Sequence, residues 1–187
     1  MIYFVDDFLS KSLLNEFLSD ETEFVEFDAN EKSFWIKMPS DDFQTYVVKK
    51  LQDIEGKQIF PILGFFREAK EGQDNSWRIH NDDIILGEQP DRAVVLFLES
   101  ENSDRLNGTA FWEHKEYGDV YTGKTNEDYD KIMREESENI DAWTLRSVVG
   151  YKQNRLVSYP CKYFHSKYPN EFTEPRRVYV LFYKVSK

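Results

Sequence analysis

One short motif in the sequence has residue types and a spacing that could bind a metal ion. In His80-Asn81-Asp82, the histidine and the aspartate are separated by a single residue. Residues i and i+2 of an extended strand point to the same face, so the imidazole and the carboxylate would converge on one point. A histidine from another strand would complete a set of two histidines and one carboxylate. Such a set leaves metal positions open and is typical of non-haem Fe(II) oxygenases.

The motif is short, and a surface turn that carries a hydrogen-bonded histidine would also contain it. The chain has only three histidines, namely His80, His114 and His165. The sequence around the motif is therefore needed to distinguish a metal site from an ordinary turn.

Residues 1–57 predict helices that support the rest of the chain. Ser10 is a typical N-cap, and apolar residues at helical spacing follow it. A second helix is predicted from Ser40-Asp41-Asp42, with acids at the positive end of the helix dipole, to the natural stop at Gly56. Short runs at 2–5 and 33–37 are typical of strands.

Residues 58–187 are typical of β structure. Short apolar runs are separated by turn-like segments at 71–75, 88–91 and 102–108. This order predicts helices packed against a β-sandwich or barrel. The runs are Ile59–Arg67, Trp77–His80, Ala93–Leu98, Thr109–Trp112, Leu156–Tyr159 and Val178–Tyr183.

One insertion, at residues 122–147, interrupts the β pattern. Its first part, 122–142, is acidic and helix-permissive, with only scattered apolar residues. The segment is either a solvated surface helix or a cover over the mouth of a barrel, because long insertions without strands often form lids or binding loops.

Composition and charge narrow the classes of protein. A length of 187 residues is typical of one domain, 1–187. With 24 Lys and Arg against 35 Asp and Glu, the net charge is −11, which disfavours nucleic acid as a partner. Cys161 is the only cysteine, so a reducing compartment fits. The acidic start indicates no signal peptide, and no apolar run approaches the roughly 18 residues that span a membrane, so we expect a cytoplasmic protein without a membrane partner.

From residue 59 onward, the order of these motifs resembles the 2-oxoglutarate/iron(II) dioxygenase family. The segment 77–82, which ends in the ligand pair, is followed by an apolar run at 92–98. Leu106-Asn107-Gly108-Thr109 is then similar to the family's Gly-Gly-Thr-like turn into the next strand. Farther on, residues 154–160 lead to His165, much as the family presents its distal histidine. In its overall sequence pattern the chain resembles small prolyl-hydroxylase-like members of the family from phages and bacteria.

The resemblance implies an iron site and a binding site for 2-oxoglutarate. His80, Asp82 and His165 would be the iron ligands. Pro175-Arg176-Arg177 opens a C-terminal strand where the family places a basic residue that binds the distal carboxylate of 2-oxoglutarate. Arg177 is our first choice and Arg176 the second, because strand alternation does not say which of the two faces inward.

The resemblance also implies a fold and a reaction. The fold would be mainly β with flanking helices: a double-stranded β-helix (jelly-roll, cupin-like) core at 58–187, with the N-terminal helices of 1–57 packed on it. The enzyme would use Fe(II), 2-oxoglutarate and O₂ to hydroxylate a C–H bond of a peptidyl residue or a small molecule, with release of succinate and CO₂. Thr109 could point toward the co-substrate.

Other residues and other functions fit the sequence less well. His114 either contacts the substrate or is a polar residue near a strand end, and the second interpretation is favoured because the metal set is already complete. Cys161 is interpreted as a small packed residue. The chain contains neither a P-loop nor a Gly-x-Ser-x-Gly motif. A cupin-like metal-binding barrel without 2-oxoglutarate chemistry, and a non-enzymatic binding domain on the same fold, stay open as alternatives. The sequence indicates neither the substrate nor the oligomeric state. Aromatic residues that either line a substrate cleft or belong to the core are Trp112, Tyr117, Tyr121 and Trp143.

Overall fold

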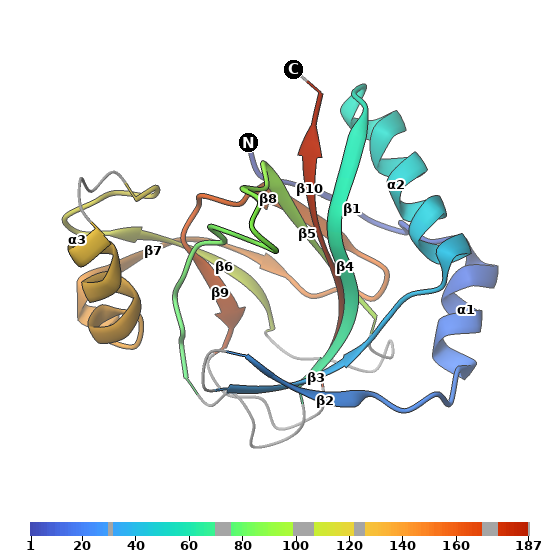
Figure 1. The fold of residues 1–187 in the computed structure, drawn as a ribbon, viewed down its shortest axis with the longest axis horizontal. Coiled ribbons are helices and arrows are strands. Elements are labelled where there is room, and N and C mark those ends of the chain that lie inside the picture. The colour runs from blue at the N-terminus through green and yellow to red at the C-terminus, as the bar shows by residue number, and fades with distance from the viewer. Residues whose placement is uncertain (30–31, 70–75, 99–106, 122–125, 170–175, 187) are drawn as a thin grey trace.

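Antiparallel β-sheets form the centre of the molecule (Figure 1). The computed structural model describes residues 1–29, 32–69, 76–98, 107–121, 126–169 and 176–186. Within these residues, a seven-stranded sheet has the order β1-β8-β5-β10-β4-β3-β2, and a three-stranded sheet has the order β7-β6-β9. The strands are β1 (Tyr3–Val5), β2 (Val25–Ala29), β3 (Lys32–Lys37), β4 (Ile59–Ala69), β5 (Arg92–Phe97), β6 (Gly108–His114), β7 (Trp143–Gly150), β8 (Leu156–Pro160), β9 (His165–Tyr168) and β10 (Arg176–Val185).

Two N-terminal helices pack on the outer face of the larger sheet, and Figure 1 shows both along the same flank. α1 (Lys11–Ser19) begins after Ser10, and α2 (Asp41–Glu55) begins after Ser40. Each serine hydroxyl accepts a hydrogen bond from a backbone N–H of the first turn. α2 ends at Gly56, whose φ of 64° is the left-handed conformation that glycine favours. The core between these helices and the sheet includes Phe43, Val47, Leu51, Phe66, Tyr179 and Leu181.

Strand β10 divides the interior into two cores. Tyr179 and Leu181 belong to the core beneath the helices, whereas Val178 and Phe182 belong to a core between the two sheets. Phe111 of β6 contributes to this second core from the smaller sheet. Because side chains alternate along a strand, the even-numbered residues of this stretch of β10 face the space between the sheets.

The insertion lies on the side of the molecule opposite α2 (Figure 1). It contains α3 (Asn126–Lys131), a π-helix (Ile132–Glu136) and a 3₁₀-helix (Ile140–Ala142). Ile132 is fully buried and forms a third core with Ile79 and the two tryptophans Trp112 and Trp143. Since Ile79 precedes His80, the insertion packs directly on the segment that carries two of the candidate metal ligands.

The predicted fold class is confirmed in that the core is mainly β and built of antiparallel sheets. Both predicted helix starts and the stop at Gly56 are also confirmed. Most predicted strands are present with small changes at their ends. No helix among the described residues is both long and apolar enough to cross a membrane.

Two details differ from the sequence prediction. Trp77–His80 forms no regular strand; within it, His80 alone pairs, in an isolated bridge with His165. Residues 143–147, predicted as the last part of the insertion, belong to β7. Apart from Trp143, the side chains of β7 are largely exposed, so it lacks the alternation that reveals a strand. The predicted turn at 71–75 and most of the one at 102–108 lie outside the described residues.

Candidate metal centre

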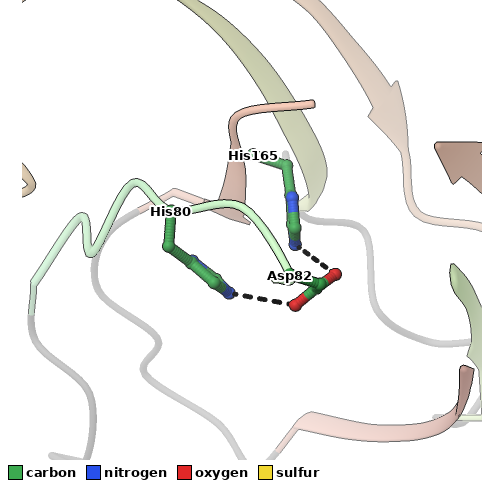
Figure 2. Close-up of side chains that lie close together, drawn as sticks. All are labelled: His80, Asp82 and His165. Atoms are coloured by element: carbon green, nitrogen blue, oxygen red, sulfur yellow. Dashed lines mark ion pairs between the residues drawn. The ribbon is translucent and has the colours of Figure 1, made fainter. Parts of the chain in front are cut away.

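Three side chains with metal-ligating atoms point toward one another (Figure 2). The ligand atoms of His80, Asp82 and His165 all lie within 4.8 Å of one another. Nε2 of His80 lies 3.8 Å from Oδ1 of Asp82, and Nε2 of His165 lies 3.4 Å from Oδ2 of the same carboxylate. The sequence predicts these residues as one set, and the structure brings all three together.

Backbone hydrogen bonds hold the two histidine-bearing segments in register. The N–H of His80 donates to the carbonyl of His165 at 3.0 Å, and the N–H of His165 donates back at 2.7 Å. The N–H of Asp82 donates to the carbonyl of Cys161 at 2.8 Å. These bonds fix the backbone of all three candidate ligands, so the site is built on rigid parts of the fold.

A backbone carbonyl two residues earlier orients each imidazole. Nδ1 of His80 lies 2.8 Å from the carbonyl oxygen of Arg78, and Nδ1 of His165 lies 2.9 Å from that of Tyr163. A carbonyl oxygen only accepts hydrogen bonds, so both Nδ1 atoms carry a proton, and Nε2 is the atom that either ring offers to a metal when it is neutral. Metal-binding histidines are oriented in this way.

The segment before His80 carries local strain. Arg78 has a left-handed backbone with φ of 42°, which non-glycine residues rarely adopt. Such a conformation costs on the order of 1–3 kcal/mol and is found mostly at functional sites. Here it belongs to the residue whose carbonyl orients the His80 ring.

Burial shifts the protonation equilibria of the site. Asp82 is 8% exposed, and burial raises the pKa of its carboxyl, although the charges of His165 and Arg78 oppose the rise. Burial also lowers the pKa of His80 well below its ordinary value of 6.5, and the neighbouring charges of His165 and Arg78 add to this. His80 is therefore neutral at neutral pH, the form that binds a metal.

The donor atoms fit a divalent cation. Oδ2 of Asp82 is buried and has no hydrogen-bond partner within the described part of the chain. The contacts dashed in Figure 2 are ion pairs when the imidazoles are protonated, whereas neutral imidazoles with the proton on Nδ1 direct their Nε2 lone pairs at the same carboxylate. A buried carboxylate that faces two lone pairs is unfavourable without a positive charge between them. Two imidazoles and one carboxylate are a donor set suited to Fe(II).

Comparison with known proteins identifies the fold. No protein-family model and no curated protein sequence matches the chain. Among solved structures, the non-haem α-ketoglutarate-dependent epimerase SnoN from nogalamycin biosynthesis matches with 13% identity and a TM-score of 0.61. HygX from Streptomyces hygroscopicus, with nickel and 2-oxoglutarate bound, matches with 9% identity and a TM-score of 0.62. The chain has the fold of the 2-oxoglutarate-dependent non-haem iron oxygenases.

A viral relative of this oxygenase fold matches over most of both chains. The collagen prolyl hydroxylase of Paramecium bursaria Chlorella virus 1, in complex with 2-oxoglutarate, has 9% identity and a TM-score of 0.55. The matches cover 98%, 98% and 97% of this chain for SnoN, HygX and the viral enzyme, and 76%, 82% and 94% of those proteins. The resemblance predicted from the sequence is thus confirmed at the level of the fold.

A cavity of about 130 Å³ lies beside the three candidate ligands, between the two sheets of the oxygenase fold. Apolar side chains such as Val95, Val178 and Phe182 form part of its wall. Thr109 also lines it, is 2% exposed, and its Oγ1 has no hydrogen-bond partner among the described residues. A buried hydroxyl of this kind fits a polar ligand in the cavity.

The two candidate arginines lie on opposite faces of β10. Arg176 lines the cavity, and its Nη2 donates to the carbonyl of Gly108 at 3.2 Å. Arg177 is exposed outside the cavity, where its Nε lies 2.6 Å from Oε2 of Glu68. This placement corrects our expectation that Arg177 faces inward, because the inner face of β10 is the face of Val178. Binding of 2-oxoglutarate by Arg176 stays a prediction.

His114 lies outside the cavity lining and is hydrogen-bonded on both ring nitrogens. It is 3% exposed, and its Nε2 lies 2.8 Å from Oε2 of Glu136. Its Nδ1 accepts hydrogen bonds from the backbone N–H groups of Glu116 and Tyr117, at 3.2 and 3.3 Å. His114 ends β6, as expected of a polar residue near a strand end, and it is also a buried residue whose ring nitrogens are both hydrogen-bonded.

The aromatic candidates and the cysteine also pack into the fold. Trp112 and Trp143 are buried in the third core, and Tyr117 and Tyr121 pack against it. Cys161 is buried, and burial raises the pKa of its thiol, which disfavours the reactive thiolate form.

Sequence reasoning missed several residues that line the cavity. Arg67 lies on the inner face of β4, two residues after Phe65, and Tyr159 lies on the inner face of β8, two residues after Val157. The alternation of these strands is visible in the sequence. The identity of the inner face is not visible there, because both faces of the larger sheet are buried.

Proposed function

We propose that the protein is an Fe(II)- and 2-oxoglutarate-dependent dioxygenase that hydroxylates a C–H bond of a peptidyl or small-molecule substrate. The observation that carries this proposal is the convergence of two imidazole Nε2 atoms on the buried carboxylate of Asp82, beside a cavity in this fold. When bound, Fe(II) supplies the O₂ activation that couples decarboxylation of 2-oxoglutarate, to succinate and CO₂, with substrate hydroxylation.

The protein's part in metal binding is to present preoriented ligands. His80 and His165 would bind the ion through Nε2, and Asp82 through a carboxylate oxygen. Because the carbonyls of Arg78 and Tyr163 hold both Nδ1 protons, neither ring has to change its tautomer before it binds. Three protein ligands leave open positions for co-substrate and O₂.

Arg176 and Thr109 are the residues we assign to 2-oxoglutarate. An inward-facing arginine binds a carboxylate through two parallel hydrogen bonds and stays charged at any physiological pH. The buried Thr109 hydroxyl can donate a further hydrogen bond from the opposite sheet. The apolar walls of the cavity limit the access of water, which strengthens both interactions.

The metal assignment is tested with a matched pair of aspartate variants. Asp82→Asn removes the charged ligand, whereas Asp83→Asn changes the adjacent, exposed aspartate in the same way. Anaerobic titration with Fe(II) should show strong loss of binding for Asp82→Asn and none for Asp83→Asn. Equal binding by both variants would contradict the assignment.

The co-substrate assignment is tested with the neighbouring arginines. On admission of air, the Fe(II)-loaded protein should form succinate from 2-oxoglutarate, and calorimetry should show tight 2-oxoglutarate binding. Arg176→Gln should weaken that binding by at least about tenfold, as expected when a charged hydrogen bond is lost, and Arg177→Gln should leave it unchanged. Metal binding without any 2-oxoglutarate binding would instead favour a metal-dependent barrel with another activity.

A further inference from the structure

Tyr159 is a buried phenol that lines the cavity beside the metal centre and that the proposed function leaves without a role. The residue is 2% exposed. Among the residues that the structure describes, its ring has close neighbours, but its hydroxyl has no hydrogen-bond partner. Burial of a hydroxyl without a partner costs free energy, so such a group in the wall of a cavity indicates a ligand that accepts its hydrogen bond.

Two aromatic contacts fix the Tyr159 ring. Its centroid lies 4.5 Å from that of the imidazole of His165, a candidate metal ligand, and 5.3 Å from that of the Phe111 ring. Its backbone lies in β8 and is paired with Ala93 of β5. Packing on two sides restricts the rotamers of the ring, so the fold sets the position of the hydroxyl before any ligand binds.

Tyr159 and Arg176 approach the cavity from opposite ends of the larger sheet. Tyr159 pairs with Ala93, and Ala93 pairs in turn with Phe182 of β10. Arg176 begins β10 and therefore lies about 20 Å along the strand from the position of Phe182. Both side chains nevertheless line the same cavity, so a ligand between them meets the guanidinium at one end and the phenol at the other.

The Tyr159 hydroxyl is a hydrogen-bond donor on the metal side of this cavity. Burial raises the pKa of Tyr159 well above its ordinary value of 10.0, and the charge of Asp82 adds to the rise while that of Arg176 opposes it. Asp82 has the larger effect of the two, which fits a phenol closer to the metal ligands than to Arg176. The hydroxyl keeps its proton at neutral pH and can donate it to an anionic acceptor.

We infer that the Tyr159 hydroxyl donates a hydrogen bond to 2-oxoglutarate at its metal-binding end, to the carboxylate next to the keto group. This inference rests on the proposed function, in which Arg176 binds the distal carboxylate. Contacts at both ends give the co-substrate one orientation in the cavity, with its chelating oxygens toward the metal ligands. The hydrogen bond also supplies the partner that the buried hydroxyl lacks in the ligand-free protein.

The test compares two buried phenols, of which only one lines the cavity. Tyr179 is fully buried, and its hydroxyl also has no hydrogen-bond partner among the described residues, but it faces the core beneath the helices. Tyr159→Phe and Tyr179→Phe each remove one such hydroxyl. Because neither hydroxyl has a partner in the ligand-free protein, neither variant should lower the midpoint of thermal unfolding.

The full chain is loaded with Mn(II) and titrated by calorimetry with 2-oxoglutarate and with oxalate. Oxalate chelates a metal in a five-membered ring, as a 2-keto acid does, but it has no distal carboxylate for Arg176. Tyr159→Phe should weaken both ligands by about tenfold or more, as expected when a hydrogen bond to a charged group is lost. Tyr179→Phe should bind both ligands as the wild type does, and Arg176→Gln should bind only 2-oxoglutarate more weakly.

Mn(II) affinity and thermal unfolding separate a ligand contact from a structural role. The Mn(II) dissociation constant of Tyr159→Phe should stay within about twofold of that of the wild type. Addition of 2-oxoglutarate to the Mn(II)-loaded protein should raise the unfolding midpoint of the wild type and of Tyr179→Phe. The same concentration should raise that of Tyr159→Phe by less, because the stabilisation depends on affinity.

Unchanged 2-oxoglutarate affinity in Tyr159→Phe would overturn the inference and leave the proposed function standing. A loss confined to 2-oxoglutarate, with oxalate bound as by the wild type, would contradict the assignment to the metal-binding end. A ligand-free midpoint clearly below that of Tyr179→Phe would show that the hydroxyl serves the fold instead. Failure of the proposed function gives a different result, because the metal-loaded wild-type protein would then not bind 2-oxoglutarate at all.

Discussion

The hydroxyl of Tyr129, in the insertion, donates a hydrogen bond of 2.8 Å to Oδ1 of Asn81, the residue between His80 and Asp82. Burial, with the nearby charges of Asp83 and Asp82, raises the pKa of Tyr129 to about 12, so the phenol keeps its proton. The backbone N–H of Ile79 also donates to the carbonyl of Ser137 at 2.9 Å. The insertion therefore holds the metal-ligand segment and is more than a removable cover.

Tyr129→Phe should weaken metal binding. The variant removes the hydroxyl and leaves Asn81 without this bond, a loss of about 0.5–1.5 kcal/mol, which corresponds to about two- to tenfold in the Mn(II) dissociation constant. Calorimetric titration measures this change. Tyr46→Phe, which removes a hydroxyl beside α1 that bonds to the Phe8 carbonyl, is the control and should leave the constant unchanged. Identical constants for both variants would show that the bond does not position the ligands.

Ile132→Ala should destabilise the protein and loosen the metal site together. The side chain is fully buried against Ile79, and its truncation leaves a cavity that costs about 2–5 kcal/mol. Urea unfolding of the metal-free protein gives the stability change, and Mn(II) titration gives the affinity. Leu145→Ala, on exposed β7, should change the stability by no more than about 0.5 kcal/mol. If Ile132→Ala lowers the stability but leaves the Mn(II) affinity unchanged, packing of the insertion does not position the candidate ligands.

Substitution of Asn154, which does not line the cavity, should lower the stability of the protein strongly. Its side chain accepts a hydrogen bond from the N–H of Leu9 at 2.7 Å and donates one to the Leu9 carbonyl at 3.0 Å, and its φ is 61°. Asn154→Ala loses both bonds and strains the left-handed backbone, at a combined cost of about 2–4 kcal/mol. Asn154→Gly should recover the part due to strain, about 1–2 kcal/mol. Equal urea midpoints for Asn154→Ala and Asn154→Gly would contradict a cost from the left-handed backbone at this position.

Acid should remove the contribution of Asp6 to stability. Hydrogen bonds from Arg155, with Lys152 in support, lower the pKa of Asp6 from 3.8 to about 2. The folded state therefore releases this proton more readily than the unfolded state, so the stabilisation is complete above pH 3.8 and disappears as the pH falls toward 2.

Unfolding of wild-type protein and Asp6→Asn is compared at pH 7 and at acid pH. The difference in stability between them should shrink below pH 4, as the carboxyl of the wild type takes up its proton. Asp53→Asn, at an exposed position of α2, is the control. A difference between wild type and Asp6→Asn that stays constant over this range would contradict the assignment.

Local signals made much of the fold predictable. Ser10, Ser40 and Gly56 are capping residues whose effect depends on their immediate neighbours, and the helices begin and end where they predict. Strand β7 was not predicted, because the polar alternation of its first four residues is short and nearly all of its side chains are exposed. The segment before His80 differs from the predicted strand because Arg78 has a left-handed backbone, which no local sequence pattern indicates.

The convergence of the three candidate ligands was predictable from the sequence, but the walls of the cavity were not. His80 and Asp82 are close in sequence, and the order of the motifs pointed to His165 as their partner. The choice between Arg176 and Arg177 depends on which face of β10 meets the other sheet. That face is set by packing against α2 on one side and β6 on the other, and each side of the strand is apolar enough to serve as either.

Asp82 and His165 lie on segments that are far apart in the chain, and non-covalent contacts join these segments: the bridge that pairs His80 with His165 and the bond from the Asp82 N–H to the Cys161 carbonyl. An ion bound to all three residues closes that long loop, as a disulfide would in a secreted protein. With a single cysteine, this chain has no such covalent cross-link of its own. On the proposed function, metal loading would stabilise the folded protein as well as permit turnover, because an ion that binds only the folded form opposes unfolding. The proposal then implies that a cell short of iron would lose folded protein along with the activity.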